Sequence, residues 1–436
     1  MATVEELLEK AERFAGQQRW EEAALVARQA VDTVPEHRWA KDKLGWYLSR
    51  AKKHADAIEV YSLLVQEAPE NPKYPYMLGY QYYDQQDFTN AVPWFRKALD
   101  LKPDYLVVLY RCGYALVKTG DVRAAEALLR DCVRYWRELE EGDAKDREKK
   151  NYADACFQLG KIYSDRDDWV SAVKAFTEAV AHESNDADKL YNLGKALVKV
   201  ENFEEALAAL LKADQIAPRK HYIQTYLAIA HHQLNNLVEA ERIFDGIPSH
   251  IKDQFPYIWQ HHAGLYRTQG RTSDAIRMLR AATRRPNEKG LHSWYDIFIL
   301  LATSCEEAED IQGAYIAYQG ANTWHVKSRG KDSPIALKKI KDLKQVASER
   351  SIDLESTSTA AYSSTDAGQS NAQVAYIKKF FTDKGYGFIQ QTTGDDLFVH
   401  IRNIINSESI REGARVEYQI GQGRKGPEAT HVHIID

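Results

Sequence analysis

Cysteine is scarce in this 436-residue chain, and none of its four cysteines lies at the C-x-x-C spacing. That spacing is typical of zinc ribbons and redox motifs, so we expect neither a zinc site nor a disulfide. No stretch reaches the roughly 18 consecutive apolar residues of a membrane-spanning helix. The opening residues, MATVEELLEK, are typical of an amphipathic helix and not of a signal peptide. These absences predict a cytoplasmic chain with reduced thiols, no metal and no membrane partner.

Sequence motifs of catalysis are absent as well. The chain has no P-loop, no G-x-S-x-G and no H-E-x-x-H. Its histidines include the adjacent pairs His231-His232 and His261-His262. Adjacent residues of a helix point about 100° apart, so such a pair does not chelate a metal as an i,i+4 pair does. We therefore expect no enzymatic activity, no catalytic residue and no cofactor.

Aromatic residues alternate with small or apolar ones in the last 64 residues, 373–436. The string KGYGFI at 384–389 places Tyr386 and Phe388 two apart, and DLFVH at 396–400 does the same for Phe398 and His400. Residues two apart on a β-strand project from the same face. Two such strands side by side would show a cluster of rings, with Lys384 at its border. Nucleobases stack on such rings at about 1–3 kcal/mol each, which predicts binding of single-stranded nucleic acid.

These strings resemble the two ribonucleoprotein motifs of the cold-shock domain family. The stretch EGARVEYQIGQGRKGPEATHV at 412–432 is similar to the closing strands of that family. The resemblance implies a small all-β domain, a five-stranded barrel of the oligonucleotide-binding type that binds single-stranded RNA, or DNA, without catalysis. The residues it implies for nucleic-acid contact are Lys378, Phe380, Phe381, Lys384, Tyr386, Phe388, Phe398, His400 and Lys425.

The opening strand departs from the family, which usually has Lys-Trp-Phe-Asn where this chain has Lys378-Lys379-Phe380-Phe381. An ungapped alignment puts Lys379 in the place of the Trp. A turn one residue shorter puts Phe380 and Phe381 in the Trp and Phe places, and we favour it because it keeps two rings on the platform. Ile401 also stands where the family often has Phe. The alternative function is therefore a pure protein-interaction scaffold whose barrel does not bind nucleic acid.

Most of the remaining chain is organised by a repeat. Residues of the same type recur at the same offsets from Leu78-Gly79, Leu159-Gly160 and Leu193-Gly194. The starts of the units are Lys10, Leu44, Leu78, Cys112, Leu159, Leu193 and Leu227. They are 34 residues apart except for one step of 47, which indicates an insertion of 13 residues within the charged run 137–150.

This pattern resembles the tetratricopeptide repeat (TPR), with about nine units. The resemblance implies an all-α superhelical solenoid in which each unit buries its apolar face against the next. A capping helix is expected from Pro334, with Leu337, Ile340, Leu343 and Val346 on one face. The chain is thus predicted to have several domains, which are a solenoid at 1–350, a flexible Ser/Thr-rich linker at 351–372 and a cold-shock-like domain at 373–436.

The concave surface of such a solenoid is formed by the first helix of each unit. The side chains predicted to line it are Trp46, Tyr76, Tyr80, Tyr83, Tyr110, Tyr114, Phe157, Lys161, Tyr191 and Lys195. Such an aromatic groove suits an extended peptide or a helix of a protein partner, although some rings would instead pack between helices. The Lys/Asn set by which chaperone-binding members hold a carboxylate is not present here. The combined prediction is a non-enzymatic adaptor between nucleic acid and a protein partner.

Basic residues gather between 267 and 289 and again between 326 and 350. In the first cluster they are Arg267, Arg271, Arg277, Arg280, Arg284, Arg285 and Lys289. These residues either extend the track of a phosphate backbone beyond the barrel or form an ordinary solvated helix face. The sequence leaves both interpretations open.

Overall fold

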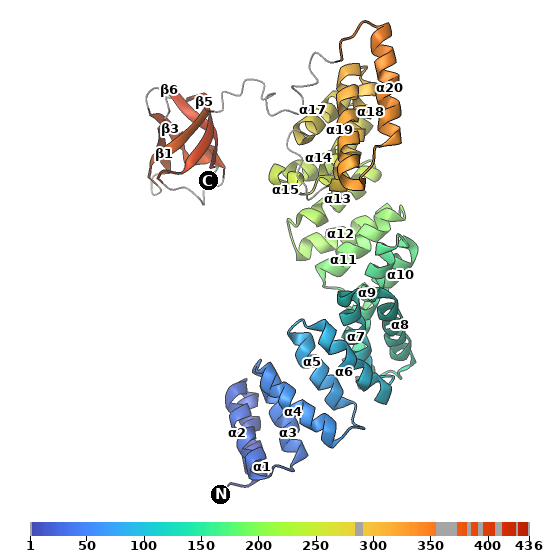
Figure 1. Ribbon diagram of the computed structural model, residues 1–436, viewed down its shortest axis with the longest axis vertical. Helices are drawn as coiled ribbons and strands as arrows, with labels where there is room; N and C mark the ends of the chain where they lie inside the picture. The colour runs from blue at the N-terminus through green and yellow to red at the C-terminus, as the bar shows by residue number, and fades with distance from the viewer. Residues whose placement is uncertain are drawn as a thin grey trace. The chain divides into compact units, whose positions relative to one another are not determined.

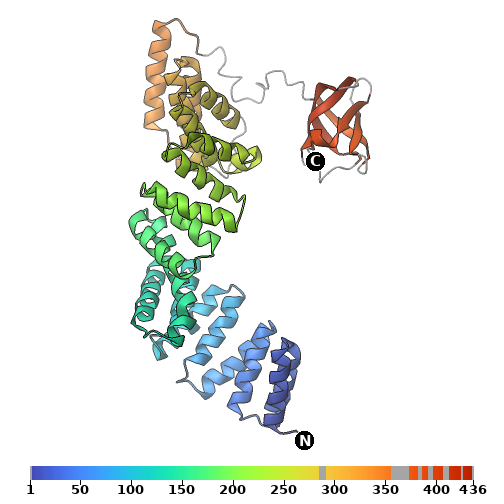
Figure 2. The ribbon, with the colours of Figure 1, turned by 180° about the vertical axis from the view of Figure 1, so that it is seen from behind.

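The computed structural model describes most of the chain, in the ranges 2–283, 291–354, 373–381, 385–390, 396–405, 412–423 and 426–434. Two compact units are present, one that ends at Lys252 and one that begins at Asp253. Figures 1 and 2 show helices throughout the first unit, and helices followed by a β-sheet in the second. None of the helices in these ranges is long and apolar enough to cross a membrane.

Within the described residues, the first unit contains seven helix pairs, and one short helix spans its end. The first helices of the pairs are α1 (Val4–Gly16), α3 (Arg38–Arg50), α5 (Lys73–Asp84), α7 (Leu106–Thr119), α9 (Asp143–Asp165), α11 (Ala187–Lys199) and α13 (His221–Gln233). The second helices are α2 (Trp20–Thr33), α4 (His54–Glu67), α6 (Phe88–Leu101), α8 (Val122–Glu138), α10 (Trp169–His182), α12 (Phe203–Ile216) and α14 (Leu237–Gly246), and α15 (Ser249–Gln254) follows. From α1 to α14 each helix packs against the next one in the chain (Figure 1).

The sequence repeat is also present in the backbone. The helices of each pair are joined through one residue in the left-handed conformation, and these residues are Gln18, Lys52, Gln86, Gly120, Asp167, Glu201 and Asn235. Their spacing is 34 residues except between Gly120 and Asp167, where it is 47. The predicted period and its one interruption are therefore confirmed by backbone geometry.

Small residues at the repeat positions allow the two helices of a pair to approach closely. A Cβ at Gly79 in α5 would lie 2.9 Å from Cδ1 of Phe95 in α6. A Cβ at Gly160 in α9 would lie 2.5 Å from Cε1 of Phe176 in α10. Both phenylalanines are buried, as is Ala91. The ring of the second helix occupies the space that a larger residue would need, so the glycine is required by packing.

The inserted residues lengthen two helices and add little loop. Helix α8 has 17 residues and α9 has 23, whereas α10 has 14. The extension is held by Trp136, which stacks on Tyr152 at a ring-centroid distance of 3.9 Å. The indole Nε1–H of Trp136 donates a hydrogen bond to the carbonyl of Lys145 (3.1 Å). The charged run 137–150 is thus mostly helical.

All four cysteines are buried and free. Burial raises the pKa of the Cys112 thiol to about 12. The Cys132 thiol contacts the carbonyl oxygen of Leu106 at 3.6 Å. At neutral pH these thiols are protonated and behave as small apolar side chains.

The helical part of the second unit contains α16 (Tyr257–Thr268), α17 (Thr272–Thr283), α18 (Leu291–Glu307), α19 (Ile311–Arg329) and α20 (Pro334–Glu349). Its core is rich in large rings, and Trp294, Phe298 and Tyr318 are almost completely buried there. These helices continue the pairwise packing, with α16 against α17 and α18 against α19.

Helix α20 begins at Pro334, as predicted. The hydroxyl of Ser333 accepts a hydrogen bond from the backbone N–H of Ala336 (3.3 Å), which caps the first turn. The packed face differs in part from the expected one, because Leu337 is 44% exposed while Ala336 and Ala347 are buried beside Leu343. The small alanines let α20 lie close to α19, while Ile340, Leu343 and Val346 of the expected face are buried or half-buried.

The β-sheet at the end of the described chain has six strands, β1 (Gln373–Phe381), β2 (Tyr386–Gln390), β3 (Leu397–His400), β4 (Ile404–Ile405), β5 (Arg415–Gly423) and β6 (Gly426–Ile434). A short 3₁₀ helix, η2 (Ile401–Asn403), connects β3 to β4. The strand order is β3-β2-β1-β5-β6-β4, and β3 also pairs with β6. The sheet therefore closes on itself through five strands, and β4 is an additional strand of two residues.

The interior of the closed sheet is apolar. It is formed by side chains that alternate with outward ones along the strands, and its buried members include Ala375, Ile377, Ile389, Val399 and Val416. Along β2 and β3 the inward residues are Gly387 and Ile389, then Leu397 and Val399. The remaining positions of both strands face outward, which determines the candidate site.

Candidate nucleic-acid interface and peptide groove

The outward face of β2 and β3 carries the predicted aromatic residues. Phe388 pairs directly with Phe398 across the two antiparallel strands, and Tyr386 pairs with His400. All four side chains are half-buried, whereas the residues between them point into the core. Period-two alternation alone is enough to bring them to one face.

The rings form one continuous surface. Tyr386 lies 5.7 Å from Phe398 and 6.3 Å from Phe388 between ring centroids, and Phe388 lies 6.1 Å from Phe398. Phe381, from the end of β1, adds a fourth ring 5.3 Å from Tyr386. We call Phe381, Tyr386, Phe388 and Phe398 the aromatic platform.

Strand β1 differs from the expectation that both Phe380 and Phe381 would lie on the platform. A register shift after Ile377 leaves Lys378 and Lys379 both exposed. Lys379 then pairs with Phe388, while Phe380 turns inward, opposite Gly387, and packs against the core. Only Phe381 of the two rings reaches the platform, because the bulge changes which residues of the strand face outward.

Two glycines of the first motif are required by this geometry. A Cβ at Gly387 would overlap the inward ring of Phe380. Gly385 has a φ of +67°, where residues with a side chain are strained. Its carbonyl accepts a hydrogen bond from the backbone N–H of Ile401 (2.9 Å), which ties the β1–β2 hairpin to the end of β3.

Positive charge near the platform comes from the two lysines of the bulge. The Nζ of Lys378 forms a salt bridge with Asp396 at 2.6 Å, and both side chains are partly exposed. The Nζ of Lys379 lies 5.3 Å from the ring centroid of Phe381. Lys384 and Lys425, which are also predicted to contact phosphate, lie outside the described residues.

The second predicted site lies on the first helices of the repeats, where five tyrosines come together. Tyr80 stacks near Tyr83 at 6.4 Å, Tyr83 lies 5.9 Å from Tyr114, and Tyr114 lies 6.4 Å from Tyr110. Tyr76 joins the same group 6.3 Å from Tyr80. We call these residues of α5 and α7 the tyrosine cluster.

Arg111 of α7 contacts three tyrosines of this cluster. Its guanidinium lies over the rings of Tyr80, Tyr76 and Tyr83, at 4.4, 5.5 and 5.9 Å from their centroids, and donates a hydrogen bond to the hydroxyl of Tyr76. Burial raises the pKa of Tyr76 to about 12, against the opposing charge of Arg111. The Tyr76 phenol therefore stays neutral at neutral pH and can both donate and accept hydrogen bonds.

A pocket of about 340 Å³ lies beside the tyrosine cluster and is lined by Trp46, Tyr76, Tyr80, Arg50 and Arg111, among others. Trp46 is 39% exposed and packs edge-on against Trp20 at 5.4 Å. This pocket joins two of the predicted groove segments, the one on α3 and the one on α5.

The other predicted groove residues, on α9 and α11, make ring and cation contacts of their own. Phe157 packs against Phe176 at 5.7 Å, and the Nζ of Lys161 lies 5.9 Å from the Phe157 ring. Tyr191 packs edge-on against Tyr222 at 4.7 Å, and Lys195 lies over Trp169 at 5.7 Å. Burial, and then the charge of Lys199, lower the pKa of Lys195. Phe157 also packs against the same buried core as Tyr76, Tyr83 and Tyr110, and the continuous groove stays a prediction.

Models of known families match both parts of the chain. The model described as 'Cold-shock' DNA-binding domain matches residues 373–435. Tetratricopeptide-repeat models match residues 8–72, 79–120, 157–221 and 197–265. The C-terminal domain belongs to the cold-shock family, and the helical part contains tetratricopeptide repeats.

Known cold-shock proteins are similar to the C-terminal domain over almost their full length. The cold shock-like protein of Thermotoga maritima is 42% identical over 62 residues, which are 14% of this chain and 94% of that protein. Cold shock protein CapB of Pseudomonas syringae pv. tomato is 41% identical over 68 residues, 15% of this chain and 99% of that protein.

Solved structures of tetratricopeptide-repeat proteins are similar to the helical part. One from Parabacteroides merdae is 15% identical, covers 65% of this chain and 98% of its own, and has a TM-score of 0.41. YrrB, described as a TPR protein with an unusual peptide-binding site, is 16% identical, covers 43% and 90%, and has a TM-score of 0.38.

Membership of these families indicates nucleic-acid binding by the cold-shock domain and protein interaction by the repeats. Neither family is a catalytic one.

Two outward residues of the cold-shock domain were not assigned from sequence. Tyr376 is 53% exposed on the outward face of β1, where it pairs with Gln390 of β2, and Lys379 borders the platform. The sequence does contain a signal for Tyr376, because it alternates with the apolar Ala375 and Ile377. No sequence pattern indicates the bulge that exposes Lys379.

Proposed function

We propose that the cold-shock domain binds single-stranded nucleic acid, RNA in preference to DNA, and that the repeats bind a protein partner, so that the chain acts as a cytoplasmic adaptor. The buried, unpaired thiols support a reducing compartment. The five longer strands would form a barrel of the oligonucleotide-binding type.

The aromatic platform carries this proposal. Its rings do not fill the domain's interior, which is formed by other residues of the same strands. Four ring centroids lie 5.3–6.3 Å from a neighbour, on one half-exposed face. Flat faces at this spacing suit successive unstacked bases, and cold-shock domains are among the modules that read single-stranded RNA in this way.

Phosphate contacts are assigned to lysines at the border of the platform. Lys378 and Lys379 stand on its β1 side, and we assign Lys384 and Lys425 the same role. His400 lies beside Tyr386 in the paired strand and extends the surface. Because Lys378 already pairs with Asp396, nucleic acid has to displace that carboxylate or share the lysine with it.

The tyrosine cluster is the proposed site for the protein partner. The tyrosine rings and hydroxyls beside Arg111 and Trp46 offer stacking surfaces, hydrogen bonds and the positive charge of Arg111 to an extended peptide. A photo-crosslinking amino acid in place of Tyr80 should trap a partner in cells. The same amino acid in place of Lys212, exposed on α12, is the control. Equal trapping at both positions would argue against a site at the cluster.

The proposed organisation is a repeat region of about nine units and a capping helix over 1–350, a tether over 351–372, and the nucleic-acid module over 373–436. Most of the tether lies outside the described residues. For about 22 residues the typical end-to-end distance is roughly 25 Å, which would hold both modules at high effective concentration.

The basic end of the repeats has less available charge than its sequence indicates. Arg267 pairs with Glu307, Arg280 with Asp310, and Arg271 and Arg277 share Asp274. The remaining three basic residues of this cluster lie outside the described part of the chain. These pairings favour the ordinary helix face over an extended phosphate track.

A competition experiment tests the proposal. Full-length protein is titrated into a labelled single-stranded RNA, and unlabelled RNA and DNA of the same sequence are then added. We expect RNA to compete at lower concentration than DNA. The alternative is a scaffold that does not bind nucleic acid, and it is favoured by Lys379 and Ile401, which stand where the family often has aromatic residues. If neither RNA nor DNA binds, this alternative replaces our proposal.

A further inference from the structure

A pocket of about 740 Å³ lies between α8, α9 and α10, among the residues around the insertion. Leu159 of α9 and Ala175 of α10 are among the apolar residues that line it. Its basic residues are Arg130, Arg134 and Arg137 of α8 and Lys174 of α10. Helix α8 is three residues longer than α10, and Arg137 is on this extension. The pocket involves no residue of the tyrosine cluster.

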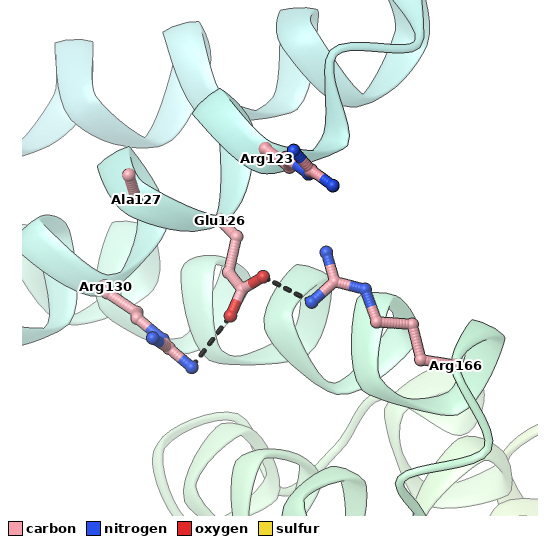
Figure 3. A pocket seen from close by; sticks show the side chains of 5 residues that line it. All are labelled: Arg123, Glu126, Ala127, Arg130 and Arg166. Atoms are coloured by element: carbon pink, nitrogen blue, oxygen red, sulfur yellow. Dashed lines mark hydrogen bonds and ion pairs between the residues drawn. The ribbon is translucent and has the colours of Figure 1, made fainter.

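A second pocket of about 510 Å³ adjoins it and shares Arg130 (Figure 3). Glu126 forms salt bridges with Arg130 at 2.7 Å and with Arg166, at the end of α9, at 2.5 Å. Arg123 also lines this pocket, and it forms no salt bridge with any residue that the structure describes. We call the two pockets together the outer groove.

The outer groove is basic around an apolar floor. Its cationic residues are Arg123, Arg130, Arg134, Arg137, Arg166 and Lys174, against the carboxylates Glu126, Glu138 and Glu178. Arg134 and Lys174 are exposed, and burial is confined to floor residues such as Cys156 and Leu159. Guanidinium groups bind carboxylates through paired hydrogen bonds, and an apolar pocket binds an aliphatic side chain.

We propose that the outer groove binds an acidic amphipathic segment of a protein partner. Aliphatic side chains of the segment enter the pocket between Leu159 and Ala175, and its carboxylates pair with Arg134, Arg137 and Lys174. The pocket volume accommodates several side chains, as in known binding clefts. This site is separate from the tyrosine cluster and adds a second protein-binding surface to the repeats.

Nucleic acid fits the same surface less well. Glu126, Glu138 and Glu178 are part of the lining and would repel a continuous phosphate backbone. The lining has one ring, Tyr163, whose hydroxyl accepts a hydrogen bond from Arg130 (3.2 Å), so it offers no row of rings on which successive bases could stack. Separate carboxylates of a peptide, by contrast, can exchange with Glu126 and Glu178 for the same guanidinium groups.

The test uses the full chain and a labelled peptide in which glutamates alternate with leucines. Binding is measured by fluorescence anisotropy for the wild type and for Arg134→Gln with Lys174→Gln. Both side chains are exposed, and the pairs of Arg134 with Asp131 and Glu138 are surface pairs, so the fold should be unaffected. Each lost charge should weaken binding about threefold, and the two together about tenfold.

Arg28→Gln with Lys212→Gln is the matched control, since both residues are exposed on other helices. It removes the same net charge and should leave the affinity unchanged. A further variant, Ala175→Glu, puts a negative charge on the pocket wall and should also weaken binding of the acidic peptide. The thermal midpoint of each variant checks its fold.

Several results would overturn the proposal. They are equal weakening by the control pair, unchanged affinity in the groove variants, and equally tight binding of a peptide with lysines in place of glutamates. Loss of single-stranded RNA binding in the groove variants, without any binding of the acidic peptide, would assign the surface to nucleic acid instead.

Discussion

Removing Phe388 and Phe398 together should abolish most RNA binding without unfolding the cold-shock domain. The two rings face each other across β2 and β3, and both contact Tyr386. Each stacked base contributes about 1–3 kcal/mol, so the removal of two stacking sites amounts to about 2–6 kcal/mol. The dissociation constant should rise about 30-fold at the low end and about 10⁴-fold at the high end.

The domain should remain folded because its interior is unchanged. Ile389, Leu397 and Val399 form the core side of the same strands. Each ring–ring interaction that the substitutions remove from the surface stabilises the domain by only about 0.5–1.5 kcal/mol. Circular dichroism and thermal unfolding of the double variant check this expectation.

The assay is fluorescence anisotropy of a labelled single-stranded RNA with full-length protein. Trp39→Ala is the control, because Trp39 is a 48% exposed ring on α3, far along the chain from the platform. It should bind RNA as the wild type does. Unchanged affinity in a folded Phe388→Ala/Phe398→Ala variant would refute the assignment of the platform.

Three other substitutions test separate parts of the chain. Gly387→Ala should destabilise the cold-shock domain by about 1–3 kcal/mol in thermal unfolding, because its Cβ overlaps Phe380, and an unchanged midpoint would contradict the inward position of that ring. Lys379→Trp should put a fifth ring opposite β2 and tighten RNA binding by about 1 kcal/mol, roughly fivefold, whereas weaker binding would show that the charge matters more. Lys189→Met should lower the free energy of unfolding by about 2 kcal/mol at neutral pH, less than for a fully buried pair, because its partners Asp154, Glu183 and Asp186 are 17%, 26% and 39% exposed. Burial would raise the pKa of Asp186, but hydrogen bonds and the charge of Lys189 lower it, so the part of this stabilisation that comes from Asp186 is lost as the pH falls below about 4, and an equal effect of the substitution at acid pH would contradict it.

The repeat architecture was predictable because its signal is periodic. The spacing of 34 residues, the step of 47 and the start of the last helix at Pro334 are all visible in the sequence and present in the structure. Each depends on local chemistry, such as a small residue where two helices meet. The exposed Leu337 was not predictable, because two alanines on the same helix decide which face packs.

The platform was predictable only where strand alternation is regular. Tyr386, Phe388 and Phe398 followed from period two. Phe380 did not, because a bulge after Ile377 reverses the faces of the residues that follow it. A bulge is determined by the pairing of whole strands, which a single-sequence pattern does not show.

The groove was predicted from repeat positions, and the structure gathers five of its tyrosines into one cluster. Repeat positions place side chains on one surface, but ring packing depends on which neighbours are aromatic. Arg111, which was not predicted, draws Tyr76, Tyr80 and Tyr83 together. The outer groove had no sequence signal, because its basic residues come from α8, from α10 and from Arg166 just after α9, whose relation is set by packing.

The most direct test of the account is titration of a labelled mixed-sequence single-stranded RNA with full-length protein at two salt concentrations, with a labelled duplex as comparison. Stacking on the platform predicts tight binding of the single strand and weak binding of the duplex. With about four lysines at the border, the slope of log affinity against log salt should not exceed about 3. Failure to bind the single strand, or equal binding of the duplex with a much steeper slope, would contradict base stacking as the basis of its function.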